Sequence, residues 1–153
     1  MKPYEPYEIS EGDLLISDDK ARLDRPLIHA FLSGRSYWAK EVPVEVVERS
    51  IEHSLCFGMY QAGRQIGFAR AVTDLATFAW LADVFILEEE RAHGYGKKLV
   101  AAIMAHPGLQ GLRRFMLGTR DAHTLYEQYG FASLKYPERF MEIQMENSYK
   151  LGS

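Results

Sequence analysis

The stretch from Phe85 to Leu99 carries the clearest chemistry in the sequence, because a strand end, a short polar loop, two glycines and a helix start follow one another. The free N–H groups at a helix N-terminus point outward, and the helix dipole favours negative charge there. Gly94 and Gly96 let the backbone approach an anion with no Cβ in the way. Arg91 adds a fixed positive charge and a fork of donors. The pattern predicts a phosphate-binding cradle.

Two other phosphate-binding motifs fit this stretch poorly. A Walker A loop needs a hydroxyl residue after its Gly-Lys pair, and Lys98 and Leu99 stand there instead. A Rossmann fingerprint needs a third small residue at the position of Leu99. Both motifs are therefore rejected.

The segment Arg91-Ala92-His93-Gly94-Tyr95-Gly96 resembles the acyl-CoA signature of the GNAT family of N-acetyltransferases, which is Arg/Gln-x-x-Gly-x-Gly/Ala after a β-strand. The resemblance implies that the cradle holds the pyrophosphate of acetyl-CoA. It also implies that backbone groups of the preceding strand bind the pantetheine arm and polarise the thioester carbonyl. The cofactor-binding residues implied in this way are Val84, Phe85, Ile86, Arg91, Ala92, His93, Gly94, Tyr95, Gly96 and Lys97. The alternative interpretation of the two glycines is a plain helix-start turn.

The segment Leu125-Tyr126-Glu127-Gln128-Tyr129-Gly130-Phe131 resembles a second family motif, Leu-Tyr-x-x-x-Gly-Phe. In the family the first tyrosine commonly donates a proton to the departing CoA sulfur, so the resemblance implies that Tyr126 is the general acid. The alternative for Tyr126 is a packing tyrosine whose hydroxyl is satisfied by backbone. For Tyr129, one helical turn further on, packing is the favoured interpretation.

Asp83 is the lone charge in the apolar run from Ala79 to Leu87. A carboxylate inside such a strand is costly to bury unless it is paired or used in chemistry. The family resemblance implies that Asp83 deprotonates the acceptor amine, directly or through water, or orients the acceptor. The alternative, which stays open, is a carboxylate that caps a loop or pairs with an arginine.

Three further residues are candidates for binding the acceptor. Tyr37 and Trp38 lie in the loop before the second helix, a region that commonly lines the acceptor pocket in the family, although they could equally cover the end of the core. His123 precedes Tyr126 and is either an acceptor contact, an additional base or an ordinary surface histidine. An asparagine that often contacts the pantetheine in the family is absent here; Asp121 or Thr119 is its candidate replacement.

Composition excludes several other classes of protein. The net charge of −3 and the lack of a basic stripe argue against a nucleic-acid partner. Cys56 is the only cysteine, and the histidines show no ligand spacing, so neither a disulfide nor a metal site is expected. The chain has no apolar run long enough to span a membrane and no signal-peptide pattern at its start. A cytoplasmic protein is expected.

The helices and strands that must position these residues are predicted from the spacing of the apolar residues and from the residues that begin or end such elements. Strands are expected at 14–17, 55–61, 64–73, 78–87, 115–118, 131–134 and 141–145, and helices at 25–33, from Pro43 onward, at 96–105 and at 122–129. The order is β-α-α-β-β-β-α-β-α-β-β, which predicts an α/β fold with a mixed sheet flanked by helices. This order is similar to that of the GNAT fold.

The sequence therefore predicts a single acetyltransferase domain over residues 1–153, with its core at about 14–145. The expected activity is transfer of acetyl from acetyl-CoA to a primary amine of a small molecule or peptide, by direct attack on the thioester. The alternative is an inactive acyl-CoA-binding or regulatory module. A homodimer is also compatible with the fold.

Overall fold

The computed structural model describes residues 5–145 and residue 149. Within this part of the chain, six strands form one sheet in the order of the sequence. They are β1 (Glu8–Glu11), β2 (Leu14–Ser17), β3 (Leu55–Gln61), β4 (Arg64–Thr73), β5 (Phe78–Ile86) and β6 (Arg114–Leu117). Neighbouring strands are antiparallel from β1 to β5, whereas β5 and β6 are parallel.

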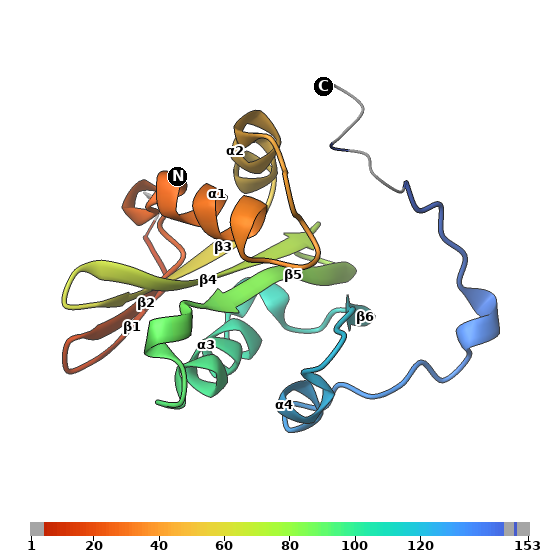
Figure 1. Cartoon of the computed structure of the whole chain (residues 1–153). Helices are drawn as coiled ribbons and strands as arrows, with labels where there is room; N and C mark the ends of the chain where they lie inside the picture. The colour runs from red at the N-terminus through yellow and green to blue at the C-terminus, as the bar shows by residue number, and fades with distance from the viewer. Residues whose placement is uncertain (1–4, 146–148, 150–153) are drawn as a thin grey trace.

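Helices cover both faces of the sheet (Figure 1). The helices α1 (Arg25–Gly34) and α2 (Val44–Glu52) lie on one face, and α3 (Tyr95–Met104) and α4 (His123–Glu127) lie on the other. Short 3-10 turns complete the elements: η1 (Lys20–Arg22), η2 (Glu88–Glu90), η3 (Pro107–Leu109) and η4 (Pro137–Arg139). None of the helices in the described part of the chain has the length and apolar character to cross a membrane.

Two apolar cores, one on each face, hold these layers together. Ile28, Phe31 and Ile51 of the helices α1 and α2 pack over one face, where Cys56 is also buried. Leu99 and other residues of α3 pack over the opposite face. Burial raises the pKa of the Cys56 thiol to about 11, so this thiol is a packing group and not a reactive thiolate.

Local sequence signals explain most boundaries. The Asp24 carboxylate accepts a hydrogen bond from the backbone N–H of Leu27 at 3.1 Å and caps α1, as predicted. The turn between β3 and β4 falls on Ala62 and Gly63, both of which have positive φ, as a tight hairpin requires. The expected mixed α/β architecture is thus confirmed, and β2, β3 and β4 occupy the predicted residues.

Three expectations about elements were wrong. Residues 131–134 and 141–145, expected as two closing strands, form no strand. Glu8–Glu11 is a strand that the sequence pattern did not indicate, because all four of its residues are exposed and the strand exists through pairing with β2. The helix expected at 122–129 is shorter, since it ends before Gly130, which has a φ of 96°.

After α4 the chain leaves the body as a C-terminal arm, defined here as residues 132–145 (Figure 1). Every residue of this arm is exposed. Within it, η4 is the sole described helical turn. Apart from Phe131, the arm contains both segments that were expected to be strands, and neither pairs with a strand in the described part of the chain.

Candidate active site

The site is a cleft that opens where β5 and β6 separate. The two strands pair from Phe78 with Arg114 to Leu81 with Leu117, and β5 then continues to Ile86 paired with β4 only. Asp83 has a φ of 54°, and the register between β4 and β5 shifts nearby. Such a bulge bends its strand. The bend leaves the peptide groups of β5 beyond Leu81 without a partner strand on the β6 side.

Two hollows meet at this opening. The α2 hollow, of about 570 Å³, lies between α2, β5 and the loop after β6. The α3 hollow, of about 470 Å³, extends from the same opening to the N-terminus of α3. Seven residues line both: Tyr37, Trp38, Val84, Arg120, Asp121, Ala122 and Tyr126. The two hollows are therefore continuous at these residues.

The N-terminus of α3 has the geometry of an open anion cradle. Gly94 is its N-cap residue with a φ of 76°, in the left-handed region that favours glycine. No side chain caps the helix, so the N–H groups of its first turn stay open. A Cβ on Gly94 would meet nothing within 4 Å, which leaves the space above the helix start free for a ligand.

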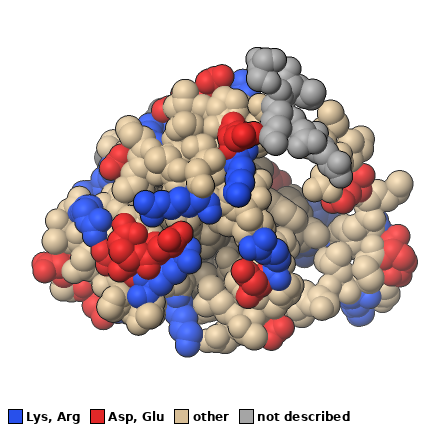
Figure 2. Space-filling model, viewed as in Figure 1, with Lys and Arg blue, Asp and Glu red and all other residues tan. Residues whose placement is uncertain are grey.

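The loop before the cradle is tied to its surroundings. Arg91 Nε donates to the carbonyl of Ile86 at 3.2 Å. Glu89 pairs with Arg35 at 3.6 Å, and Glu90 pairs with Arg64. Figure 2 shows acidic and basic side chains interleaved on one face of the molecule. The run Glu88–Glu90 is therefore partly neutralised rather than wholly solvated.

Most of the residues predicted to bind the cofactor line the α3 hollow together. They are Val84, Phe85, Ile86, Arg91, Ala92, Gly94, Tyr95 and Gly96. Two of the predicted set lie outside its lining. His93 is exposed with its ring 5.5 Å from that of Tyr95, and the Lys97 carbonyl accepts a hydrogen bond from the Tyr129 hydroxyl at 2.8 Å. Tyr129 thus fastens α4 to α3.

Tyr126 stands at the junction of the two hollows. Its side chain is buried, and its ring packs edge to face against Phe131. Within the described part of the chain its hydroxyl makes no hydrogen bond, and the residue lines both main hollows. Burial, and secondarily the nearby Tyr37, raise the pKa of Tyr126 to about 12. The hydroxyl is therefore protonated at neutral pH and available as a donor.

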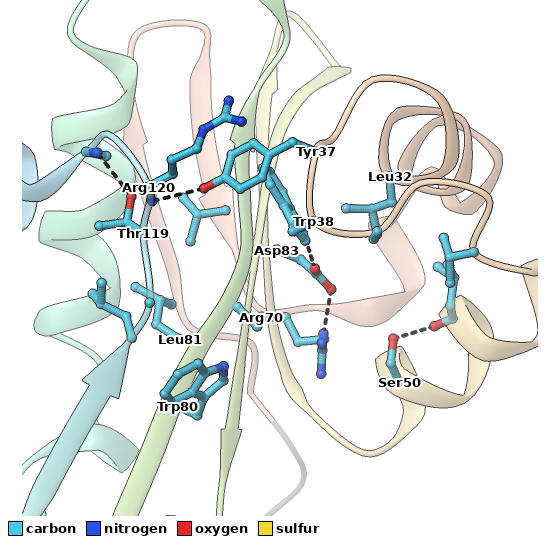
Figure 3. Close-up of a pocket in the computed structure, with 18 of the residues that line it drawn as sticks. Leu32, Tyr37, Trp38, Ser50, Arg70, Trp80, Leu81, Asp83, Thr119 and Arg120 are labelled. Atoms are coloured by element: carbon cyan, nitrogen blue, oxygen red, sulfur yellow. Dashed lines mark hydrogen bonds and ion pairs between the residues drawn. The ribbon is translucent and has the colours of Figure 1, made fainter. Parts of the chain in front are cut away.

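Both oxygens of the Asp83 carboxylate are occupied (Figure 3). Trp38 Nε1 donates to one at 2.8 Å, and Arg70 Nε donates to the other at 2.9 Å. The Arg70 guanidinium also donates to the Ser54 hydroxyl at 3.2 Å. The structure thus shows Asp83 paired with an arginine and hydrogen-bonded to Trp38 in the wall of the α2 hollow, and its part in catalysis stays a prediction.

Tyr37 lies between the two hollows and contacts the opposite wall. Its hydroxyl accepts a hydrogen bond from the backbone N–H of Arg120 at 3.1 Å. The Arg120 guanidinium carbon lies 3.8 Å from the centre of the Tyr37 ring. Figure 3 shows Tyr37 reaching across β5 towards Arg120. The loop after α1 and the loop after β6 are joined in this way over the cleft.

His123 lies apart from Tyr37 and Trp38, the other two residues predicted to bind the acceptor. It lines a third hollow of about 300 Å³ beside β6 and contributes to neither of the hollows that share Tyr37 and Trp38. Thr119 accepts a hydrogen bond from the backbone N–H of Ala122 at 3.0 Å and so shapes the start of α4. Asp121 is exposed and lines both main hollows.

Among the residues of the α2 hollow that sequence reasoning missed are the large polar and aromatic side chains of Arg70, Trp80 and Arg120. A signal existed for Arg70. It is the cation in the apolar run from Ile66 to Val72, and Asp83 is the lone anion in the next strand of the same antiparallel pair. Opposite charges on adjacent strands favour pairing. No comparable signal marked Arg120, which lies in a loop.

Among the described residues, no group of three or more histidine, cysteine or acidic side chains gathers in a way that could hold a metal ion. The groups of the cleft that could bind or react with a ligand are instead its backbone N–H and C=O groups, its hydroxyls and the helix start at Gly94. An anionic donor fits the α3 hollow, and a second molecule fits the α2 hollow. Tyr126 can give a proton where the two would meet.

Comparison with known proteins agrees with this geometry. Residues 52–133 match the acetyltransferase (GNAT) domain. A protein of Gibberella zeae assigned as an acetyltransferase is 32% identical over 143 residues, which cover 79% of this chain and 80% of the relative. A solved structure from Xanthomonas campestris pv. campestris, of a protein belonging to the GNAT family, is 51% identical with a TM-score of 0.87 and covers 89% of this chain and 96% of its own.

A more distant structure shares the fold alone. It is a GNAT family acetyltransferase from Elizabethkingia anophelis with acetyl-CoA bound, at 16% identity and a TM-score of 0.61, covering 90% of this chain and 91% of its own. The family match and the two more similar relatives carry the assignment. This chain belongs to the GNAT family of acetyltransferases.

Proposed function

We propose that this protein transfers an acetyl group from acetyl-CoA to a primary amine by direct attack of the amine on the thioester. The observation that carries the proposal is the position of the protonated Tyr126 hydroxyl, at the junction of a hollow that ends in an anion cradle and a second hollow. A donor thioester in the first hollow and an amine in the second would meet beside this hydroxyl.

The cradle supports binding of the donor. The open N–H groups at the start of α3 suit a pyrophosphate, and Gly94 leaves room for its oxygens. Peptide groups of β5 around Val84 that face away from β4 can hydrogen-bond the amide groups of a pantetheine arm. The bound acetyl-CoA of the Elizabethkingia anophelis structure is in keeping with this donor.

Tyr126 is the proposed general acid. In the reaction the amine nitrogen attacks the carbonyl carbon, the C–S bond breaks, and the departing sulfur takes the phenolic proton. Positioned acids of this kind contribute about 10²–10⁴-fold to a rate. Water restores the proton to the phenolate, whose high pKa makes it a strong base.

Asp83 is proposed to position groups rather than to accept the proton of the amine. Its two oxygens are already hydrogen-bonded by Trp38 and Arg70, which supports this role over that of a base. The amine proton then leaves through water. The α2 hollow, with Tyr37 and Trp38 in its wall, is the proposed acceptor site for a small-molecule or peptide amine.

The alternative function is an acyl-CoA-binding module without turnover. A single pair of measurements distinguishes the two. Calorimetry with acetyl-CoA tests the cradle, and thiol release in the presence of a panel of amines tests catalysis. Binding with amine-dependent thiol release supports the transferase, binding without release from a broad panel supports the module, and no binding overturns both. A cytoplasmic location is proposed with either function, and the homodimer stays a prediction.

A further inference from the structure

Both tryptophans of the chain, Trp38 and Trp80, line the α2 hollow. Each keeps much of its surface open, since Trp38 is 42% exposed and Trp80 is 39% exposed. Aromatic side chains that stay exposed inside a cleft are typical of the lining of a ligand pocket. Trp38 also lines the α3 hollow, whereas Trp80 does not. The two indoles therefore bound the α2 hollow at its junction with the α3 hollow and beyond that junction.

The indole of Trp38 is fixed by its neighbours. Its Nε1 donates to the Asp83 carboxylate at 2.8 Å, and Arg70 Nε donates to the other oxygen of that carboxylate at 2.9 Å. The Trp38 ring centre lies 5.0 Å from that of Tyr37, with the two ring planes at 85°. Because these contacts hold the indole in place without a ligand, little conformational entropy is lost when a ligand packs against it.

Trp80 forms the wall of the hollow on the side of the sheet (Figure 3). It lies in β5, in register with Val72 of β4 and Met116 of β6. The benzo end of its indole lies beside Gly118, the residue that follows β6, because a Cβ added to Gly118 would be 3.7 Å from Cη2 of Trp80. The indole therefore reaches from β5 to the end of β6.

The helices supply aliphatic side chains to the same hollow. Leu32 of α1 and Val46 and Val47 of α2 line it. The hollow is thus bounded by aliphatic groups on the side of the helices and by an indole on the side of the sheet. A flat apolar ring between these walls would remove apolar surface from water on both of its faces, which favours binding.

Charge argues against a ligand with several ammonium groups. The charged residues that line the hollow are Arg70, Asp83, Arg120 and Asp121. The Asp83 carboxylate is paired with Arg70 at 2.9 Å. Among the described residues that line the hollow, the exposed Asp121 alone offers a carboxylate outside this pair. Several ammonium groups would therefore enter a hollow that has no excess of negative charge to receive them.

We propose that the acceptor is an arylalkylamine, a monoamine whose aromatic ring is joined to the amine by a short flexible chain. This inference rests on the proposed function, which places the reacting amine at the junction beside Tyr126. The ring then extends beyond the junction and packs against Trp80, offset or edge to face as aromatic pairs prefer. Trp80 is thereby assigned as a residue that determines specificity for the acceptor.

The first experiment compares three amines in a thiol-release assay with saturating acetyl-CoA. They are 2-phenylethylamine, n-butylamine and spermidine, compared at equal concentrations of the neutral amine. The kcat/KM for 2-phenylethylamine should exceed that for n-butylamine by about 10-fold or more, because the butyl chain has no ring to pack against Trp80. Spermidine should be the poorest acceptor, since its further ammonium groups lack partners.

Variants of Trp80 then locate the contact. Trp80→Ala should lower kcat/KM for 2-phenylethylamine by about 10-fold or more and that for n-butylamine much less. Trp80→Phe keeps an aromatic ring and should retain most of the preference. Phe78→Ala is the matched control, because Phe78 lies two residues away in β5, is 38% exposed and lines none of the three hollows. This variant should leave the preference unchanged.

Acetyl-CoA affinity in calorimetry should be the same in Trp80→Ala as in the wild type, because Trp80 does not line the α3 hollow. Circular dichroism checks the fold, and if Trp80→Ala does not fold, the wild-type panel and Trp80→Phe still test the proposal. A wild type that prefers n-butylamine or spermidine, or an equal loss for both monoamines in Trp80→Ala, would overturn the arylalkylamine and leave the transferase standing. A chain that binds acetyl-CoA but releases no thiol with any amine would instead overturn the proposed function, and the acceptor with it.

Discussion

The Tyr37 hydroxyl accepts a hydrogen bond from the backbone N–H of Arg120 at 3.1 Å while the Arg120 guanidinium lies over the Tyr37 ring. The two residues come from loops that follow different elements and that meet only over the cleft. Both line the α2 and the α3 hollows. The contact therefore fixes the distance between the two walls at the point where donor and acceptor would meet.

Removing this contact should loosen the acceptor site. Tyr37→Phe keeps the ring under Arg120 but loses the hydrogen bond, which is worth about 0.5–1.5 kcal/mol. Tyr37→Ala loses both. We expect the KM for the amine to rise in Tyr37→Phe and further in Tyr37→Ala, with acetyl-CoA affinity changed less. Steady-state kinetics with each substrate varied in turn measure this, and an unaltered KM in Tyr37→Ala would contradict it.

Tyr126→Phe should separate binding from turnover. The substitution removes only the hydroxyl, which has no hydrogen-bond partner in the described chain, so the fold and acetyl-CoA affinity should be retained. The loss of the acid should slow kcat by about 10²–10⁴-fold. Calorimetry and thiol-release kinetics measure the two effects. A rate unchanged at saturating substrates would show that water protonates the leaving thiolate.

Gly94→Glu should abolish acetyl-CoA binding. The new side chain would place a carboxylate where the proposed cradle would receive phosphate, and the φ of 76° adds strain of about 1 kcal/mol. Gly111→Glu is the matched control, because Gly111 has a φ of 72°, a Cβ added to it would meet nothing within 4 Å, and it lines none of the three hollows. Both variants should lose similar stability, but only Gly94→Glu should lose binding in calorimetry.

Asp83→Asn distinguishes a positioning carboxylate from a base. The amide can still accept from Trp38 but leaves the Arg70 charge uncompensated, and breaking this partly buried pair should cost about 1–3 kcal/mol, between the values for exposed and for buried pairs. We expect a lower melting temperature and a higher KM for the amine, with the acid limb of the pH–rate profile retained. Asp121→Asn removes an exposed carboxylate from the same cleft and should leave the melting temperature unchanged. Loss of the acid limb in Asp83→Asn alone would instead identify Asp83 as the base.

Stability should fall at alkaline pH because burial raises the pKa of several acidic groups, among them Cys56, Tyr60 and Tyr126. Burial raises the pKa of Cys56 from 9.0 to about 11, and it raises the pKa of Tyr126 from 10.0 to about 12. Between the unfolded and the folded values the unfolded state holds fewer protons, so the free energy of unfolding decreases as pH rises. Below about pH 9 neither group contributes to the slope. Urea titrations from pH 8 upward should show a shallower decline in Tyr126→Phe than in the wild type, and equal slopes would contradict this assignment.

Features governed by neighbouring residues were predictable from the sequence, and features governed by distant ones were less so. The Asp24 cap and the hairpin at Ala62 and Gly63 depend on residues next to one another, and each was found where expected. The helix start at Gly94 was predictable for the same reason, and its role as an anion cradle stays a prediction. Tyr37 and Trp38 were placed at the cleft through family resemblance, and the geometry that joins them to Arg120 and Asp83 comes from the folded sheet.

The two closing strands show the opposite limit. Alternation at Met141 and Ile143 correctly describes a segment with one apolar side, but a strand also requires a partner edge, which a local pattern does not reveal. The converse holds for Glu8–Glu11, which is polar and exposed and is a strand because β2 lies beside it. Whether these segments form strands depends on pairing with a neighbouring strand rather than on their composition.

The ion pairs of Glu89 with Arg35 and of Glu90 with Arg64 bear on which polyanions can reach the cradle. These pairs neutralise the Glu89 and Glu90 carboxylates. The remaining charges of the loop, on Glu88 and Arg91, are opposite in sign, so the entrance to the cradle is close to electrically neutral. A highly charged ligand is then neither repelled nor drawn in from a distance, since long-range steering needs an excess of one sign. Selection must occur at short range, through the N–H groups of the helix start. Such an entrance discriminates by shape and hydrogen bonding, and it holds little attraction for nucleic acid or other bulk polyanions.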